Sequence, residues 1–165
     1  MYHLAMPNRL SGDGPPAGAA FLLPQLGAHA ADRFAERIAP LGLAPRHVGL
    51  LRWINHNTAT TQRDIAAAFG VRPSRIVVLL DELEELGLAR REVDSTDRRN
   101  RAVRLTTQGH RALTHVGQAF LAHQNDLLSA LTSGEQATLA TLLARVAEQQ
   151  GLSAGVHPGY RDDRA

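Results

Sequence analysis

Residues 61–109 read TQRDIAAAFGVRPSRIVVLLDELEELGLARREVDSTDRRNRAVRLTTQG, and this stretch decides the fold. Thr61 and Asp64 are spaced as a capping box, with Asp64 in place of the usual Glu or Gln, and predict a short helix to about residue 69. A tight turn at residues 70–72 leads to Pro73, which suits the first turn of a second helix over about residues 73–86. The apolar residues of this helix recur at helical spacing and predict a buried stripe of Ile76, Leu79 or Leu80, Leu83 and Leu86. This order is typical of a helix–turn–helix.

The hydrophobic period changes after Gly87, which ends the second helix. Residues 88–93 and 101–105 each predict a short strand, and the Asp-Ser-Thr-Asp sequence at 94–97 supplies the turn between them. A hairpin directly after the second helix makes a winged helix–turn–helix, which we expect over about residues 43–106. The predicted fold class is therefore mainly α with a small β-hairpin wing.

Further helices are predicted on both sides of this unit. One begins near Pro24 and runs to about residue 40, and another spans residues 43–57. Thr106 or Thr107 can cap a helix over about 108–131, and Thr132 with Glu135 forms a capping box for a last helix to about residue 149. The apolar stripes at about 20–40 and 107–149 exceed what a winged-helix core of about 70 residues buries, so we expect these segments to be dimerisation helices of a two-fold homodimer.

Length and composition bound the other possibilities. The 165 residues fit one domain over about 20–150, with Gly- and Pro-rich segments at 1–19 and 151–165 expected to be flexible tails. The chain has no cysteine, no apolar run long enough for a membrane, and no signal-like start, so a cytoplasmic protein without membrane contact is expected. No pair of its eight histidines has a recognised helical metal spacing, so neither metal nor cofactor is predicted.

Positive charge is concentrated in one part of the chain. All 18 basic side chains are arginine, and between residues 88 and 111 seven arginines stand against three acidic residues, a local balance of +4 in a chain of net charge +2. Such a concentration favours a surface that faces phosphates.

Several motifs in a fixed order resemble the MarR (multiple antibiotic resistance regulator) family over about residues 20–150. They are Ser74–Arg75–Ile76, Leu88–Ala89–Arg90–Arg91, Asp97–Arg98–Arg99–Asn100–Arg101 and Leu105–Thr106–Thr107–Gln108–Gly109. The resemblance implies a homodimeric transcription regulator, usually a repressor, that binds a palindromic operator in double-stranded DNA and is often released by a small ligand. It also implies that the helix at 73–86 enters the major groove and that the wing arginines lie at or in the minor groove.

The helix–turn–helix then supplies the candidate base and phosphate contacts. Arg75 can make a bidentate contact with guanine or a simpler phosphate contact, and Arg72 and Ser74 adjoin it, although Ser74 can equally help cap the helix. Thr61 and Gln62 can donate to phosphates, although capping alone explains Thr61. The family often has polar residues at the two following positions, where this chain has apolar side chains that can touch thymine methyls, namely Val77 and Val78.

The wing supplies a second group of candidates. Arg98 and Arg99 fall at the predicted hairpin tip, where a guanidinium can enter a narrow, electronegative groove. Asp97 would repel phosphate if it faced outward, so we expect it to orient the wing by pairing with an arginine. Arg101 is either that partner or a phosphate contact.

A possible effector pocket is implied by the same resemblance, near the first two helices. Its candidate residues, which could hold an anionic aromatic ligand, are His29, Arg46, His47 and Trp53. The alternative is that the tryptophan packs in the core and its polar neighbours are exposed.

The sequence also bears on two other functional classes. The apolar pair Val77 and Val78 favours a winged-helix protein-interaction or architectural module with only non-specific DNA binding. An enzyme is disfavoured, because the sequence offers no recognisable nucleophile–base pair, carboxylate pair or phosphate-binding loop.

Overall fold

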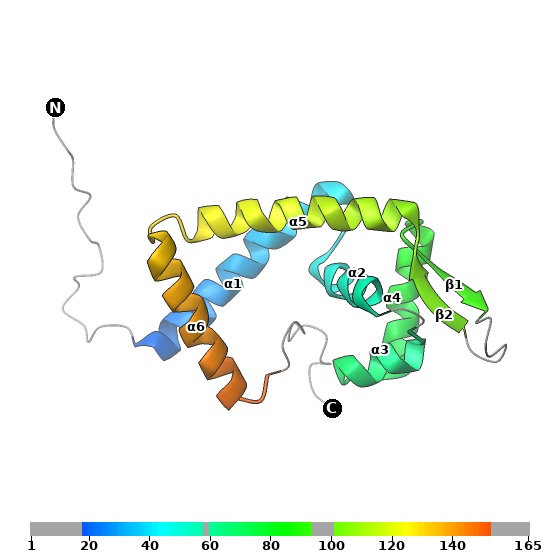
Figure 1. Ribbon diagram of the computed structural model, residues 1–165, viewed down its shortest axis with the longest axis horizontal. Coiled ribbons are helices and arrows are strands. Elements are labelled where there is room, and N and C mark those ends of the chain that lie inside the picture. Colours follow the sequence, from blue (N-terminus) through cyan, green and yellow to red (C-terminus); the bar gives the residue numbers. More distant parts are fainter. Residues whose placement is uncertain (1–17, 58–59, 94–100, 153–165) are drawn as a thin grey trace.

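The computed structural model describes residues 18–57, 60–93 and 101–152. It is mainly helical with one two-stranded hairpin, as predicted (Figure 1). The elements in chain order are α1 (Ala19–Ile38), the 3-10 helix η1 (Ala39–Leu41), α2 (Pro45–His56), α3 (Gln62–Phe69), α4 (Pro73–Glu85), β1 (Ala89–Val93), β2 (Arg101–Leu105), α5 (Thr107–Leu127) and α6 (Ser133–Gln149).

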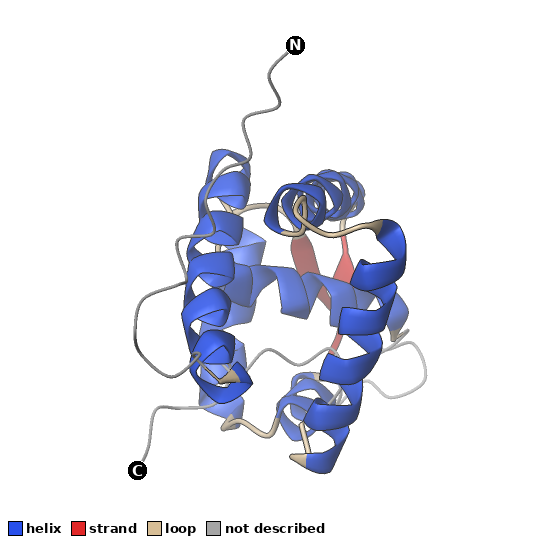
Figure 2. Ribbon diagram, turned by 90° about the vertical axis from the view of Figure 1, so that its left-hand side faces the viewer, coloured by secondary structure: helices blue, strands red, loops and turns tan. Residues whose placement is uncertain are grey.

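The long helix α5 joins two parts of the molecule. In Figure 1 it runs across the top, with α2, α3, α4 and the hairpin below one end and α6 descending from the other, while α1 packs against it. Figure 2 looks along α5, with the strands behind it. The helix–turn–helix and its wing therefore lie at one end of α5, and α1 and α6 lie at its other end.

The core lies inside the winged-helix part. The predicted stripe of α4 is buried at Ile76, Leu79, Leu80 and Leu83, each at most 4% exposed. Leu86 is 37% exposed, contrary to expectation, because α4 ends at Glu85 and Leu86 is its C-cap residue. The largest fully buried side chains are Ile38, Leu50, Leu51, Ile65, Ile76, Leu80, Leu83 and Val103.

The predicted helix starts are confirmed where a side chain caps the helix. The Thr61 hydroxyl accepts from the Asp64 amide at 3.3 Å while Asp64 accepts from the Thr61 amide at 2.8 Å, which completes the capping box. Thr132 and Glu135 form the same arrangement at the start of α6. These hydrogen bonds lower the pKa of both carboxyl groups, with the threonine side chain as the largest cause.

Two helix ends differ from prediction. Helix α1 begins at Ala19, so Pro24 lies inside it rather than at its start. Proline lacks the amide that would bond to the carbonyl one turn earlier, and this first part of the helix is exposed enough for water to satisfy that carbonyl. Helix α5 ends at Leu127, four residues before the predicted end, and the Gln136 side chain donates to the Leu128 carbonyl at 3.2 Å.

The apolar side chains of α1, α5 and α6 are largely exposed. No residue of α6 is buried, and none of the described helices is long and apolar enough to cross a membrane. The exposed large apolar side chains on these three helices are Phe21, Leu23, Leu26, Phe120, Leu121, Leu142, Leu143 and Val146.

A tight junction fixes the start of α5 against the start of β1. The Leu88 carbonyl accepts from the Thr106 amide at 3.0 Å, and the Thr106 hydroxyl donates to the Gly87 carbonyl at 2.6 Å and also caps α5. A Cβ on Gly109 would lie 2.0 Å from the Leu88 carbonyl oxygen, so the backbones meet too closely for any side chain there. This contact explains Thr106 and Gly109 in the Leu-Thr-Thr-Gln-Gly sequence at residues 105–109.

We predict that Gly109→Ala lowers the free energy of unfolding by about 1–3 kcal/mol, because the added methyl must displace backbone. The matched control is Gly117→Ala in the same helix, where an added Cβ meets nothing within 4 Å and higher helix propensity stabilises by up to about 1 kcal/mol. Urea unfolding of both variants measures the difference. A Gly109→Ala protein as stable as the control would contradict the close contact.

Candidate nucleic-acid interface

Helix α4 presents one exposed edge, while its opposite face is in the core. Val77 and Val78 are 36% and 56% exposed on that edge, and Ser74 is exposed near its N-terminus. Arg72 is the N-cap residue, and Arg75 in the first turn is half-buried. The residues of α4 that were predicted to contact DNA bases thus lie together on the accessible part of the helix.

The two candidates at the start of α3 have structural roles. The Thr61 hydroxyl donates to the Asp64 carboxylate at 2.7 Å in addition to capping the helix. The Gln62 side chain, with its amide oxygen toward Arg91, accepts from Arg91 Nη2 at 3.2 Å and from Nε at 2.5 Å. A phosphate contact from either residue stays a prediction.

Arg91 joins the wing to the reading helix. Its side chain is 12% exposed, and Nη1 lies 2.7 Å from Asp81 Oδ1 and also pairs with Glu84. Its backbone amide donates to Glu84 at 2.7 Å, and Nη2 donates to the Val77 carbonyl at 3.3 Å. We call Arg91 with Asp81 and Glu84 the wing clamp, because it fixes β1 of the hairpin against α4.

The wing clamp was missed by the sequence interpretation, which counted Arg91 only as part of the basic segment. The sequence did contain a signal for this contact. Asp81 and Glu84 are three residues apart and therefore lie on one face of α4, and the strand that follows carries an arginine.

The charge balance of the hairpin also needs correction. Arg90 and Arg104 face each other across the two strands, and both pair with Glu92, with nitrogen–oxygen distances of 2.6 and 3.0 Å. Together with Arg91, three of the four arginines of this segment whose side chains are described therefore have carboxylate partners within the protein. The local balance of +4 overestimated the charge facing outward, because it left out the acidic residues of α4.

The wing tip lies outside the described residues, and with it Asp97, Arg98 and Arg99. Arg101 begins β2, but its side chain is also outside the described part. Their expected contacts with the minor groove stay predictions.

The four effector-pocket candidates lie in different surroundings. His47 is 5% exposed, its Nδ1 accepts from the Ala44 amide at 3.1 Å, and its Nε2 lies 2.6 Å from Glu82 Oε2. Since Nδ1 accepts, the proton is on Nε2, which donates to Glu82. Arg46 Nε donates to the same oxygen at 3.2 Å. These two residues therefore tie α2 to α4.

Trp53 and His29 are placed elsewhere. The Trp53 ring packs edge-on against Phe69 with centroids 5.6 Å apart, and its Nε1 donates to the Thr60 hydroxyl at 3.4 Å. His29 lies on α1, beside a cavity that α1 shares with α5.

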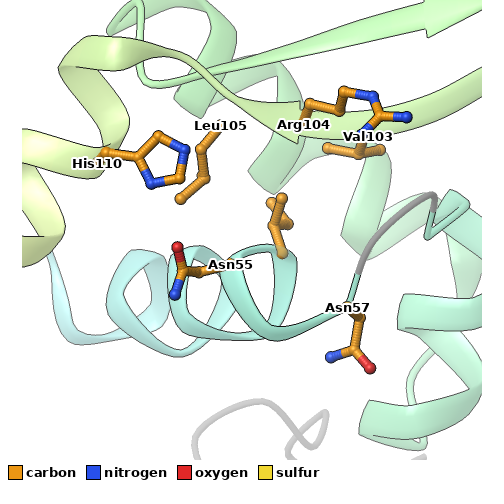
Figure 3. Close-up of a pocket in the computed structure, with 7 residues that line it drawn as sticks. Asn55, Asn57, Val103, Arg104, Leu105 and His110 are labelled. Atoms are coloured by element: carbon orange, nitrogen blue, oxygen red, sulfur yellow. The ribbon is translucent and has the colours of Figure 1, made fainter.

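A second cavity, of about 180 Å³, lies where α2, β2 and the start of α5 meet. Figure 3 shows Asn55 of α2 pointing toward His110 and Leu105. The cavity is lined by Ile54, Asn55, Asn57, Val103, Arg104, Leu105 and His110. Among the described residues, no group of three or more histidine, aspartate or glutamate side chains could hold a metal ion.

A helix–turn–helix with an exposed reading edge and a braced hairpin defines a winged-helix DNA-binding protein. A family model described as the MarR family matches residues 41–100. The transcriptional regulatory protein proposed for the hcr operon of Thauera aromatica is 35% identical over 118 residues, 71% of each chain. This chain belongs to the MarR family, whose members are transcription regulators and not enzymes.

Solved structures show the same fold. The transcriptional repressor CouR bound to a 23-mer DNA duplex is similar with a TM-score of 0.70 and 26% identity, over 79% of this chain and 92% of that chain. CouR from Rhodococcus jostii RHA1 bound to p-coumaroyl-CoA is similar with a TM-score of 0.66 and 28% identity, over 82% and 96% of the two chains.

We predict that Arg91→Gln weakens DNA binding about tenfold or more, because charge-assisted hydrogen bonds worth about 1.5–3 kcal/mol no longer hold the wing. Arg90→Gln is the matched control, since it removes the same charge from the same strand at a side chain that is 59% exposed. Fluorescence anisotropy on one duplex at one salt concentration compares the two. Equal losses would mean that only charge, and not the wing clamp, matters.

The contact between His47 and Glu82 predicts a pH dependence of stability. The hydrogen bond from His47 is the largest cause that lowers the pKa of Glu82 from its ordinary value of 4.5. A group whose pKa is lower in the folded than in the unfolded protein stabilises the fold when the pH is above its unfolded-state pKa. That contribution is lost as the pH falls through its folded-state pKa. Glu82→Gln should therefore destabilise most at neutral pH and progressively less below about pH 4.5.

Urea unfolding of the Glu82→Gln protein between neutral and acidic pH measures this effect. Glu85→Gln, an exposed change on the same helix, is the control. A stability difference that stays constant down to strongly acidic pH would show that the lost interaction does not depend on the Glu82 charge.

Proposed function

We propose that this chain is a cytoplasmic, homodimeric repressor that binds a palindromic operator and is released by a small-molecule effector. The observation that carries the proposal is the exposed edge of α4, which the wing clamp holds at a fixed place beside the hairpin. A reading helix and a wing that keep one relative position can meet adjacent grooves of one duplex.

On this proposal, α4 lies in the major groove. Arg75 and Arg72 supply the charged contacts near its N-terminus, and Ser74 donates to a base or a phosphate. Val77 and Val78 contact thymine methyls, because exposed apolar side chains in the groove have no hydrogen bond to offer.

The wing then reaches the minor groove with Arg98 and Arg99, whose guanidinium groups suit its negative potential. Asp97 orients the wing, and Arg101 is its partner or contacts a phosphate. Thr61 and Gln62 flank the phosphate backbone from α3.

The dimer forms through α1, α5 and α6. Their exposed apolar side chains would be unusual on a monomer, and a second copy of the same surfaces would bury them. Two-fold symmetry places two α4 helices on one face of the duplex, and a palindromic operator matches that symmetry.

The experiment that tests this proposal is fluorescence anisotropy of the full chain on the DNA flanking its own gene, beside a scrambled duplex of equal length. A specific regulator should prefer the native fragment by a factor of about 1000 or more at physiological salt. Equal, weak and steeply salt-dependent binding to both duplexes would favour the interaction or architectural module, which has only phosphate attraction.

A further inference from the structure

Most of α4 carries no side chain that can donate a hydrogen bond. After Arg75 its residues read IVVLLDELEE, over 76–85, and every one of them is apolar or acidic. The exposed ones are Val77, Val78, Asp81 and Glu85. A DNA base that faces this part of the helix therefore meets only apolar side chains and carboxylates.

Val77, Val78 and Asp81 lie together on the exposed edge of α4. Asp81 follows the two valines by four and three residues, and residues at these spacings are neighbours on a helix surface. The Asp81 side chain is 53% exposed, similar to the 56% of Val78. The edge thus places an apolar surface directly beside a hydrogen-bond acceptor.

Arg91 holds this arrangement in place. Its Nη2 donates to the Val77 carbonyl at 3.3 Å, and its Nη1 lies 2.7 Å from Asp81 Oδ1. A valine in a helix has one strongly preferred rotamer, so the methyl groups of the valines are fixed as well. A carboxylate accepts at both oxygens, and Asp81 can therefore accept from a base while it is paired with Arg91.

The groups that each base presents in the major groove decide which base fits this edge. Guanine presents two acceptors, adenine an acceptor and a donor, and thymine an acceptor beside its methyl group. Asp81 repels such an acceptor, and no later side chain of α4 donates to it. Cytosine presents only its N4 amino donor, which suits Asp81 but leaves the valines without an apolar partner. 5-Methylcytosine adds a methyl group on the adjacent ring atom and presents no acceptor.

We propose that the exposed edge of α4 recognises 5-methylcytosine in double-stranded DNA. Val77 and Val78 cover its methyl group, and Asp81 accepts a hydrogen bond from its N4 amino group. Thymine shares the methyl group and therefore matches the valines but not Asp81. This inference rests on the proposed function, and it makes DNA binding depend on cytosine methylation.

Fluorescence anisotropy on the native DNA fragment, with every cytosine of both strands replaced by 5-methylcytosine, tests this dependence. Covering one methyl group should tighten binding about fourfold, which corresponds to about 0.8 kcal/mol, and covering one in each half-site about fifteenfold. A scrambled duplex of equal length and composition, methylated in the same way, controls for effects of methylation on duplex shape. No gain on the native fragment, or an equal gain on the scrambled duplex, would overturn the proposal.

Single replacements then locate the recognised base. Each cytosine of the native fragment is replaced in turn by 5-methylcytosine, and the position with the largest gain is also changed to a thymine–adenine pair. The chain should bind 5-methylcytosine there about tenfold or more tightly than thymine, as expected for a charge-assisted hydrogen bond. Equal binding of the two bases would show that Asp81 reads nothing. If uracil in place of thymine weakens binding while methylated cytosine gives no gain, thymine is the recognised base and the proposal is wrong.

Variants assign the two contacts. Val78→Ala, at an exposed position where alanine favours the helix, should lose most of the gain from methylation. Asp81→Asn, whose amide can donate to thymine O4, should lose the preference for 5-methylcytosine over thymine. Leu86→Ala is the control, because it shortens another exposed apolar side chain, at the C-cap of α4, and should keep both ratios. Each ratio compares two duplexes with one protein, so a change in wing position cancels. Unchanged ratios in Val78→Ala and Asp81→Asn would overturn the assignment.

The same duplexes separate this inference from the proposed function. If the chain does not prefer the native fragment over the scrambled duplex in either methylation state, the proposed function is overturned. If it prefers the native fragment equally with and without methylation, the proposed function stands and recognition of 5-methylcytosine is overturned.

Discussion

The contact between the Leu88 carbonyl and the first turn of α5 is the constraint on which the rest of the arrangement depends. Thr106 and Gly109 meet that carbonyl at the point where α4 has just ended and β1 is about to begin. Because a side chain at Gly109 would overlap the carbonyl, α5 has little freedom to slide there. The orientation of the long helix therefore sets the orientation of the whole helix–turn–helix and its wing.

The wing clamp extends this rigidity to the reading surface. Arg91 reaches two carboxylates and one carbonyl of α4 from the adjacent strand, so α4 and β1 are held to each other as well as to α5. His47 and Arg46 hold α2 to Glu82 on the neighbouring face of α4. The acidic side chains of α4 thus lower the outward positive charge of this region, but they also hold its elements together. This structural role explains why so many acids lie beside a basic segment.

Local features of the sequence were predictable, and distant pairings were not. The capping boxes of Thr61 and Thr132 act within three residues, so they follow from spacing alone, whereas spacing left the cap of α5 open between Thr106 and Thr107 and the structure places Thr106 there. The pairing of His47 with Glu82 spans 35 residues, and no periodicity indicates which histidine finds which acid. The wing clamp was not predicted for the same reason. Its arginine lies on β1 and its two carboxylates lie on α4, and it is the turn between α4 and β1 that brings them together.

Helix α5 is held near both ends, to the start of β1 at one and to α1 at the other. Arg37 and Asp126 lie near the last turns of α1 and α5, whereas the junction at Leu88 holds the first turn of α5. The same helix therefore carries the contacts that place α4 and β1 and the contacts that place α1.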